Sequence, residues 1–439
     1  MFISNLLMMK NNKRVLVVSN NCFSPSNSNG RTLGNLFYGW PKENLAQFCV
    51  IAKDPAWDVC DNYYCLEDRT MLAAFKHGKK AVGRKLQVPV LNNNSTTDVK
   101  EPIDTQRKNV GKKTLPKVML RELVWAFKRW KSSNFEQWIE NFNPDIVVLQ
   151  FGDSSFMIDI ALYVAQSRNI PLVVYNTEGY YFFPRNWHFK SKLDGILFPI
   201  YKHSYQTKVR KLMAYASHSV YLNDKLQDDY DKEFGGKSSV IYNSSGLQHC
   251  NAPAFDNDVP HISYLGNLGL DRDSALAEVG EVLYNIDSRY HIDVYGNADE
   301  KIARTLNEAK GVVFHGCVSY DKVKEVIDDS DILFHVESEH GYKERQLQYA
   351  FSGKIADSVS SGKCFVLYGP KDLACSMYII ETGAGWFADN KAKLKQVIVN
   401  IMNNAQERNV VLKKAKVVAE QNHSFEGNAR KFQNILLNV

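Results

Sequence analysis

The chain lacks long hydrophobic runs and paired-cysteine motifs. Among its 439 residues, no stretch of about 18 consecutive apolar residues occurs, which argues against a transmembrane helix. Its eight cysteines include no Cys-x-x-Cys pair, and its eleven histidines form no His-x-x-x-His or Cys-His cluster. We therefore expect no disulfide framework and no zinc site, but core cysteines in a reducing compartment.

The N-terminus also lacks the features of a signal peptide. Its short apolar stretch precedes the basic residues and is not followed by a small-residue cleavage site. Hydrophobic residues make up 44% and charged residues 23% of the chain, as in a globular protein. The length exceeds what one hydrophobic core supports, so we expect two domains. Because we find neither a signal peptide nor a transmembrane run, we expect a cytoplasmic protein.

Short apolar segments alternate with helical ones along the whole chain. In the first half they are RVLVVS, DIVVLQF and PLVVYN, and in the second half HSVYLN, SSVIYN, HISYLG, YHIDVYG, GVVFHG, DILFHV and KCFVLYG. This alternation is typical of buried parallel strands and predicts an α/β protein with two doubly wound domains. We place them at residues 1–213 and 214–439, with a mobile loop at about 86–115 and the last helix packing back on the first domain.

One segment is strongly basic. Between Lys76 and Lys131 there are fifteen Lys or Arg but four Asp or Glu. A helix is expected after residue 114, with one face formed by Lys117, Arg121, Lys128 and Lys131 beside Trp130 and other apolar residues. Two interpretations stay open: a core helix with a solvated basic face, or a surface that binds anionic lipid. No nucleic-acid motif accompanies the segment.

A small-residue turn precedes one of the predicted helices. Ser352, Gly353 and Lys354 come directly before a helical run that ends at Gly362. Backbone amides at a helix N-terminus, with a lysine beside them, suit a phosphate group. A lysine in the first turn is poorly placed against the helix dipole unless an anion is near, which favours this interpretation.

The order of these motifs resembles a known family. YLGNLGLDRD, IDVYGN, VVFHGCVSYDKVKEVIDDSDILFHVE and SGKIADSVSSGKCFVLYG are similar to the donor-binding domain of family 4 glycosyltransferases, and RVLVVSNNCFSPSNSNGRTLGNLFYGW resembles the opening of bacterial members that build surface polysaccharides. The similarity covers nearly the whole chain. It implies the GT-B fold, two Rossmann-like domains facing across a cleft, and a retaining hexosyltransferase-type enzyme that uses a nucleotide-diphosphate sugar.

The resemblance also assigns roles to residues. Arg272 and Lys354 match the basic positions that contact the diphosphate, and Asp357 matches the acid that accepts hydrogen bonds from the ribose. Glu339 is our choice for the acid facing the sugar, because Tyr349 occupies the position where the family has it. The full set expected to bind the donor is Gly30, Arg31, Gly266, Asn267, Arg272, Ser352, Gly353, Lys354 and Asp357. Arg272 could alternatively be an exposed loop cation, and Gly30 part of a turn before a helix capped near Thr32.

On the acceptor side the sequence departs from the family. Where members often have a histidine, after PLVVYN, this chain has Glu178. Glu178 could orient the acceptor hydroxyl, take its proton, or be an ordinary acid at a helix N-terminus. If the donor phosphate takes the proton, as is often proposed for retaining enzymes, no strong protein base is required. No metal or other cofactor is expected, because the Asp-x-Asp pairs either surround Arg272 or flank a strand.

Three functions therefore compete. The first is a glycosyltransferase, with UDP the expected carrier, that modifies a glycan or lipid-linked glycan at the inner membrane face without binding nucleic acid. The second is a nucleotide-sugar epimerase or a phosphorylase on the same fold. The third is a non-catalytic homologue that binds a nucleotide sugar or a partner transferase.

Overall fold

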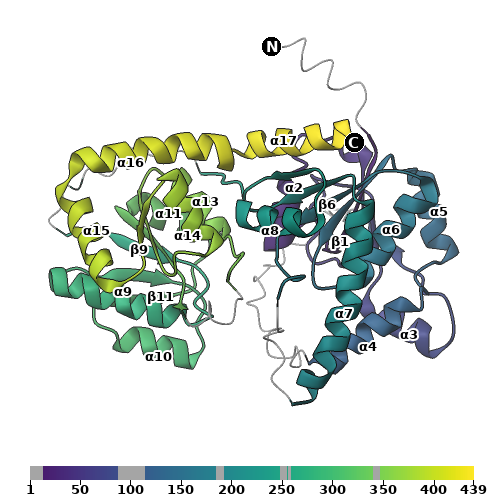
Figure 1. Ribbon diagram of the computed structural model, residues 1–439, viewed down its shortest axis with the longest axis horizontal. Helices are drawn as coiled ribbons and strands as arrows, with labels where there is room; N and C mark the ends of the chain where they lie inside the picture. Colours follow the sequence, from purple (N-terminus) through teal and green to yellow (C-terminus); the bar gives the residue numbers. More distant parts are fainter. Residues whose placement is uncertain (1–12, 88–113, 184–191, 248–254, 256–258, 340–346) are drawn as a thin grey trace, which may run out of the picture. The chain divides into compact units, whose positions relative to one another are not determined.

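The computed structural model describes residues 13–87, 114–183, 192–247, 255, 259–339 and 347–439 (Figure 1). The chain divides into two compact units. The first comprises Met1–Val220, Tyr230–Ser239 and Phe432–Val439, and the second comprises Tyr221–Asp229 and Val240–Lys431. Most of the loop expected at 86–115 falls at 88–113, outside the described residues.

The first unit is built on an eight-stranded sheet of order β4-β3-β2-β1-β5-β6-β7-β8. Its central strand β1 pairs in parallel with β2 and β5, and the short β4 pairs antiparallel with β3. The strands are β1 (Val15–Asn21), β2 (Leu45–Ile51), β3 (Tyr63–Cys65), β4 (Arg84–Lys85), β5 (Ile146–Phe151), β6 (Leu172–Asn176), β7 (His218–Tyr221) and β8 (Ser238–Val240).

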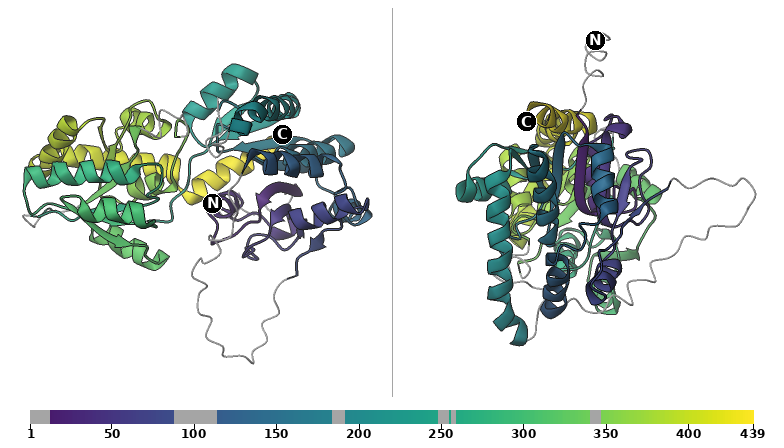
Figure 2. Two further views of the ribbon diagram at one scale, coloured as in Figure 1. Left: turned by 90° about the horizontal axis from the view of Figure 1, so that it is seen from below. Right: turned by 90° about the vertical axis from the view of Figure 1, so that its right-hand side faces the viewer.

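Helices flank this sheet on both sides (Figure 2). Residues Val15 to Val18 of β1 are all fully buried, which requires a covered sheet on both faces because successive side chains alternate between them. The helices are α2 (Ser28–Asn35), α3 (Asp68–Lys76), α4 (Leu115–Ala126), α5 (Ser133–Phe142), α6 (Phe156–Arg168), α7 (Lys192–Tyr215) and the C-terminal parts of α8 (Asp224–Phe234) and α17 (Phe425–Asn438), with a short 3₁₀ helix at Lys42–Asn44.

The second unit holds a six-stranded sheet of order β11-β10-β9-β12-β13-β14, with every pair parallel. Alternate residues of its strands enter two separate cores: Phe334 and Val366 pack on one face, and Leu333 and Phe365 on the other. The strands are β9 (Ile262–Leu265), β10 (Ile292–Tyr295), β11 (Val312–Gly316), β12 (Ile332–Val336), β13 (Cys364–Tyr368) and β14 (Trp386–Ala388).

The helices of this unit cover both faces of the sheet. Residues of α9 and α15 belong to one core, and residues of α13, α14 and α16 to the other. Their bounds are α9 (Arg272–Ile286), α10 (Glu300–Glu308), α11 (Tyr320–Asp329), α13 (Gly353–Ser360), α14 (Ala374–Thr382), α15 (Lys391–Asn403) and α16 (Ala405–Val418), followed by the π-helical turn η3 (Ala419–His423).

The predicted strands are present, but two of them lie in the other sheet. HSVYLN and SSVIYN form β7 and β8, which extend the first sheet. The expected boundary at 213/214 therefore falls inside the first unit, because Ser217 already donates a backbone hydrogen bond to Leu172 at the start of β6. The end of α17 belongs to the first unit, where Phe432 packs against Phe37 and Tyr175.

The predicted basic helix is wrong in its extent. Helix α4 ends at Ala126, Lys128 has a left-handed backbone (φ 52°), and Ser132 caps the separate helix α5. Only Lys117 and Arg121 of the four basic residues are therefore helical. Trp130 is fully buried against Phe135 and Tyr163, so it cannot contact a lipid surface. Lys131 lies over the Tyr163 ring, 3.3 Å from its centroid.

A buried histidine makes the second unit sensitive to acid. His423 lies at the end of η3, where its ring contacts the Tyr378 hydroxyl (2.9 Å) and the Asn243 carbonyl (2.8 Å). Burial lowers the pKa of His423 to about 4, so the unfolded chain binds the extra proton between about pH 6.5 and 4. We expect the free energy of unfolding to fall by about 3 kcal/mol across that window as the pH is lowered.

Urea unfolding from pH 7 to pH 4 would measure this effect. His423→Gln, which cannot take the proton, should flatten the acid limb of the profile. An unchanged profile in that variant would mean that other groups control the acid sensitivity.

Among the described residues, no helix is both long and apolar enough to cross a bilayer.

Candidate functional site

Each sheet has one place where the strand order reverses. In the second sheet the chain runs from β9 outward to β10 and β11, then returns to β12 on the other side of β9. In the first sheet the corresponding place lies between β1 and β5. Because ligands of open α/β sheets bind beyond the carboxyl ends of the strands at such a reversal, these two places are where site residues should gather.

Arg272 and Glu337 meet at the reversal in the second unit. Arg272 is the first residue of α9, which follows β9, and Glu337 comes directly after β12. The guanidinium donates from Nε (3.0 Å) and from one terminal nitrogen (2.8 Å) to the two carboxylate oxygens. Both residues are buried, Arg272 at 8% and Glu337 at 2% exposure. The pair is a desolvated, bidentate ion pair at the strand reversal.

This geometry overturns one expectation for Arg272 and limits the other. It is not an exposed loop cation, and two of its donor nitrogens are already bonded within the protein. The physical reason is that the turn after β9 is short, and Asp271 takes a left-handed conformation (φ 57°) that starts the helix at Arg272. Any ligand must therefore use the remaining edge of the guanidinium or displace Glu337.

Glu337, and not Glu339, is the acid that the fold brings to Arg272. Glu339 is exposed, whereas Glu337 also accepts a hydrogen bond from the His335 ring (3.0 Å). Burial raises the pKa of Glu337, but the His335 hydrogen bond and the Arg272 charge outweigh it and hold that pKa below the usual range. The position of Glu337 at the end of the apolar run DILFHV was the sequence signal for this role.

His335, Glu337 and Cys375 place one potential ligand atom each within 4.8 Å of the others. The donor set does not suit a cation. Arg272 already neutralises the carboxylate, and burial, followed by the Glu337 charge, raises the pKa of the Cys375 thiol far above its ordinary value. The guanidinium opposes a cation at this place, so we interpret the cluster as part of the buried Arg272–Glu337 ion pair.

The turn that we expected to precede a helix lies at the start of α13. The helix begins at Gly353, and the Ser352 hydroxyl accepts from the Lys354 amide at 3.2 Å. Lys354 Nζ lies 3.8 Å from Asp357 Oδ2, with about a third of its side chain exposed, and Asp357 accepts from the Ser245 hydroxyl (2.9 Å). Helix α13 thus presents a lysine and backbone amides on its first turn, with the Asp357 carboxylate on the turn that follows.

The loop after β9 is held by its own backbone. The Gly266 amide donates to the Tyr295 carbonyl (3.0 Å), and a Cβ at Gly266 would lie 2.7 Å from the Tyr264 hydroxyl. Asn267 is exposed, and its side chain accepts from the Gly269 amide. Because glycine has no side chain, the loop that leads to Arg272 can pack closely against the Tyr264 side chain.

In the first unit, Gly30 and Arg31 lie inside helix α2 and not in a loop. Asn27, not Thr32, caps this helix by accepting from the Gly30 amide (3.0 Å). A Cβ at Gly30 would lie 2.3 Å from the Cys22 carbonyl oxygen, so only glycine fits between the helix and the end of β1. Close packing within the protein therefore explains why position 30 is a glycine, and a bound ligand is not needed for this explanation.

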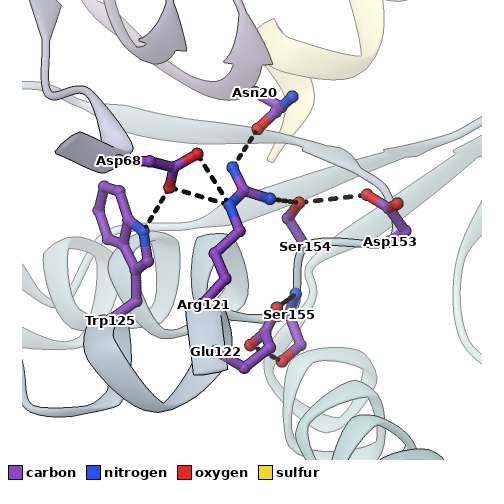
Figure 3. A network of polar contacts seen from close by, with 8 residues as sticks. All are labelled: Asn20, Asp68, Arg121, Glu122, Trp125, Asp153, Ser154 and Ser155. Atoms are coloured by element: carbon purple, nitrogen blue, oxygen red, sulfur yellow. Dashed lines mark hydrogen bonds and ion pairs between the residues drawn. The ribbon is translucent and has the colours of Figure 1, made fainter. Parts of the chain in front are cut away.

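Arg121 is the centre of a polar network at the reversal in the first unit (Figure 3). Its guanidinium donates to the Asp68 carboxylate (2.9 Å), to the Ser154 hydroxyl (2.7 Å) and to Asn20 (3.2 Å), which lies near the end of β1. The Trp125 indole donates to the same Asp68 (2.8 Å). Arg121 therefore ties α3 and α4 to the ends of the central strands and is not part of a basic surface.

Glu178 lies at the carboxyl edge of the same sheet, close to Asp153. The last residues that pair between the neighbouring strands β5 and β6 are Phe151 and Asn176. Asp153 and Glu178 each lie two residues beyond this pair. Burial, and next the charge of Asp153, raise the pKa of Glu178 to about 7. A carboxyl group with that pKa can accept a proton near neutral pH and release it again.

Comparison with known proteins adds one result. No protein-family model matches the chain, and no curated protein matches by sequence. Solved structures do match. HepE of Anabaena in complex with UDP is 12% identical, with a TM-score of 0.61, over 97% of this chain and 100% of that one.

Two lipopolysaccharide enzymes match comparably. The outer core galactosyltransferase WaaB is 12% identical, with a TM-score of 0.59, over 97% of this chain and 99% of that one. The glycosyltransferase WaaG is 12% identical, with a TM-score of 0.55, over 97% and 100%. At such identities the likeness shows the fold alone, and the fold is the GT-B fold of glycosyltransferases.

Proposed function

We propose that this protein is a retaining, family 4-like glycosyltransferase that moves a sugar from a nucleotide-diphosphate sugar, with UDP as the expected carrier, to a hydroxyl of a glycan or lipid-linked glycan. The observation that carries the proposal is that Arg272 and the Lys354 turn follow β9 and β12, the two strands at the reversal in one unit of a GT-B fold. UDP bound to HepE, which shares this fold, supports the choice of nucleotide.

The donor's diphosphate is assigned to the second unit. The developing charge on the departing diphosphate would be stabilised by Lys354, by the amides of the first turn of α13, and by the edge of Arg272 that Glu337 leaves open. Asp357 is suited to accept hydrogen bonds from ribose hydroxyls. No resident metal is needed for this charge balance, because the cations are side chains.

The acceptor is assigned to the first unit. The bond between the anomeric carbon and the diphosphate oxygen breaks with its electron pair going to the diphosphate, and the acceptor oxygen bonds to the carbon. The acceptor proton moves to Glu178, whose raised pKa suits a base near neutral pH. Polysaccharide synthesis at the inner face of the cytoplasmic membrane is the setting we propose.

Calorimetric titration with UDP, GDP and UDP-sugars, with and without EDTA, tests the donor site. Lys354→Ala should weaken binding of the diphosphate about tenfold, because a charge-assisted hydrogen bond contributes about 1.5 to 3 kcal/mol. Lys322→Ala is a matched control, since Lys322 is also a helical lysine paired with an acid three residues on, Glu325.

Equal binding by the wild type and Lys354→Ala would remove the phosphate assignment. Binding without transfer to any acceptor would favour the non-catalytic homologue, and interconversion of UDP-sugars would favour an epimerase. Loss of binding in EDTA would contradict the proposal that no metal is required.

A further inference from the structure

Helix α4 exposes an apolar face. Leu120, Leu123 and Phe127, at the C-terminal half and cap of the helix, are 51%, 50% and 54% exposed. Their spacing of three and seven residues puts them on one side of the helix. Trp125, on the opposite side of α4, lies in the core of the first unit, and Val124 is buried beside the stripe. About half of each side chain in the stripe nevertheless remains exposed to water.

Helix α7 carries a second stripe with the same spacing. Leu193, Ile196 and Ile200 are 53%, 71% and 60% exposed, and Ile196 is the most exposed large apolar residue of the described chain. Helix α3 contributes Leu72, which is 38% exposed. The ring of Phe75 on α3 lies 4.9 Å from the ring of Phe127.

These helices are neighbours. Helix α4 packs against both α3 and α7. Both views show α7, α4 and α3 in that order along one edge of the first unit (Figures 1 and 2). The seven exposed apolar residues of α3, α4 and α7 thus belong to one end of one unit.

The exposed charges around these residues are mostly basic. In segments 68–80, 115–131 and 192–204, the exposed charged residues are basic except for Asp68, whose side chain is 47% exposed and is paired with Arg121. The acids there are engaged or buried: Asp68 accepts from Arg121, Glu122 accepts from Ser155, and Asp194 is buried. The basic residues are Arg69, Lys76, Lys79, Lys80, Lys117, Lys128 and Lys192.

We propose that this apolar-basic surface docks on an anionic lipid bilayer, with the stripes of α4 and α7 entering the headgroup region. Exposed apolar side chains bordered by lysines match both parts of such a membrane, its acyl boundary and its negative surface. A second copy of the chain fits less well, because a two-fold contact would bring like charges together. The inference deepens the proposed function, on which it rests for the lipid-linked acceptor.

Sedimentation with vesicles tests it on the full chain. The probes are phosphatidylcholine vesicles with and without phosphatidylglycerol. The wild type should bind the anionic vesicles, and Ile196→Asp/Ile200→Asp should bind at least about tenfold more weakly, because two large side chains lose their burial. The control is Ile380→Asp/Val417→Asp on α14 and α16, where each residue is 50% exposed.

Lys117→Gln/Lys192→Gln should weaken binding to anionic vesicles and reduce its dependence on salt. UDP titration and circular dichroism of every variant separate surface effects from unfolding. Equal sedimentation of Ile196→Asp/Ile200→Asp and wild type would overturn the proposal. So would a wild-type dimer in solution that the same variant converts to a monomer. If the protein bound vesicles but no nucleotide, the proposed function would be contradicted, whereas the proposed membrane-docking surface would still stand.

Discussion

Glu178→Gln is expected to lower the turnover of sugar transfer by about 10² to 10⁴, the usual contribution of a positioned general base. The amide keeps the size of the side chain and removes its ability to take a proton. Binding of the nucleotide sugar should be unchanged, because the donor is assigned to the other unit. The measurement is kcat for transfer to a saturating acceptor, beside calorimetry of UDP binding.

The pH profile gives an independent readout for the same residue. Because the pKa of Glu178 is raised to about 7, the carboxylate form that accepts protons disappears as the pH falls, and turnover should fall below about pH 7. The charge of Asp153 contributes to that rise, so Asp153→Asn should move the acid limb to lower pH. A Glu178→Gln enzyme with wild-type turnover would indicate that the departing phosphate takes the acceptor proton instead.

Arg272→Ala is expected to lower the free energy of unfolding by about 3 to 5 kcal/mol, because it leaves the buried Glu337 without its counter-charge. This differs from the behaviour of an exposed phosphate contact, whose removal would weaken binding and leave the fold intact. The loss should be confined to the second unit. Urea unfolding gives the size of the effect, and hydrogen exchange at β9 and β12 gives its location.

The matched variant is Arg272→Met/Glu337→Leu, in which both charges are replaced by apolar side chains. It should recover most of the lost stability, because the cost arises from an unpaired buried charge and not from the absence of the pair. It should not recover nucleotide binding. A single Arg272→Ala variant as stable as the wild type would mean that Glu337 is hydrated or protonated once Arg272 is gone.

The strands could be predicted because parallel strands covered on both faces are short, continuous apolar runs. DILFHV and KCFVLYG have this pattern and became β12 and β13. Strands β3 and β14, with three residues each, and β4, with two, were not predicted, although the three-residue β8 was. β2 is a seven-residue run that we did not include. The pairing partners of β7 and β8 depend on the tertiary fold, which local sequence does not encode.

The sequence located single elements of the candidate site better than it located the contacts between distant residues. Lys354 and the start of α13 follow from a local turn, and they are where the sequence placed them. Glu337 and Arg272 are 65 residues apart, and only the adjacency of β9 and β12 brings them together. Trp130 and Arg121 would lie on one amphipathic surface if the helix were continuous. The left-handed turn at Lys128 instead changes the direction of the chain after α4.

The C-terminal segment of the first unit has a consequence for biosynthesis. Gln433 donates to the Tyr38 carbonyl across 395 residues of sequence, and Phe432 covers Phe37 and Tyr175. The rest of the first unit is complete once Ser239 has been made, so the chain from Val240 to Lys431 must be synthesised before the covering segment appears. At about 5 to 20 residues per second, this takes about 10 to 40 s. During that interval the nascent first unit presents an uncovered aromatic surface, which is the kind of surface that chaperones bind. The second unit, whose residues are nearly all contiguous, can finish folding before the first.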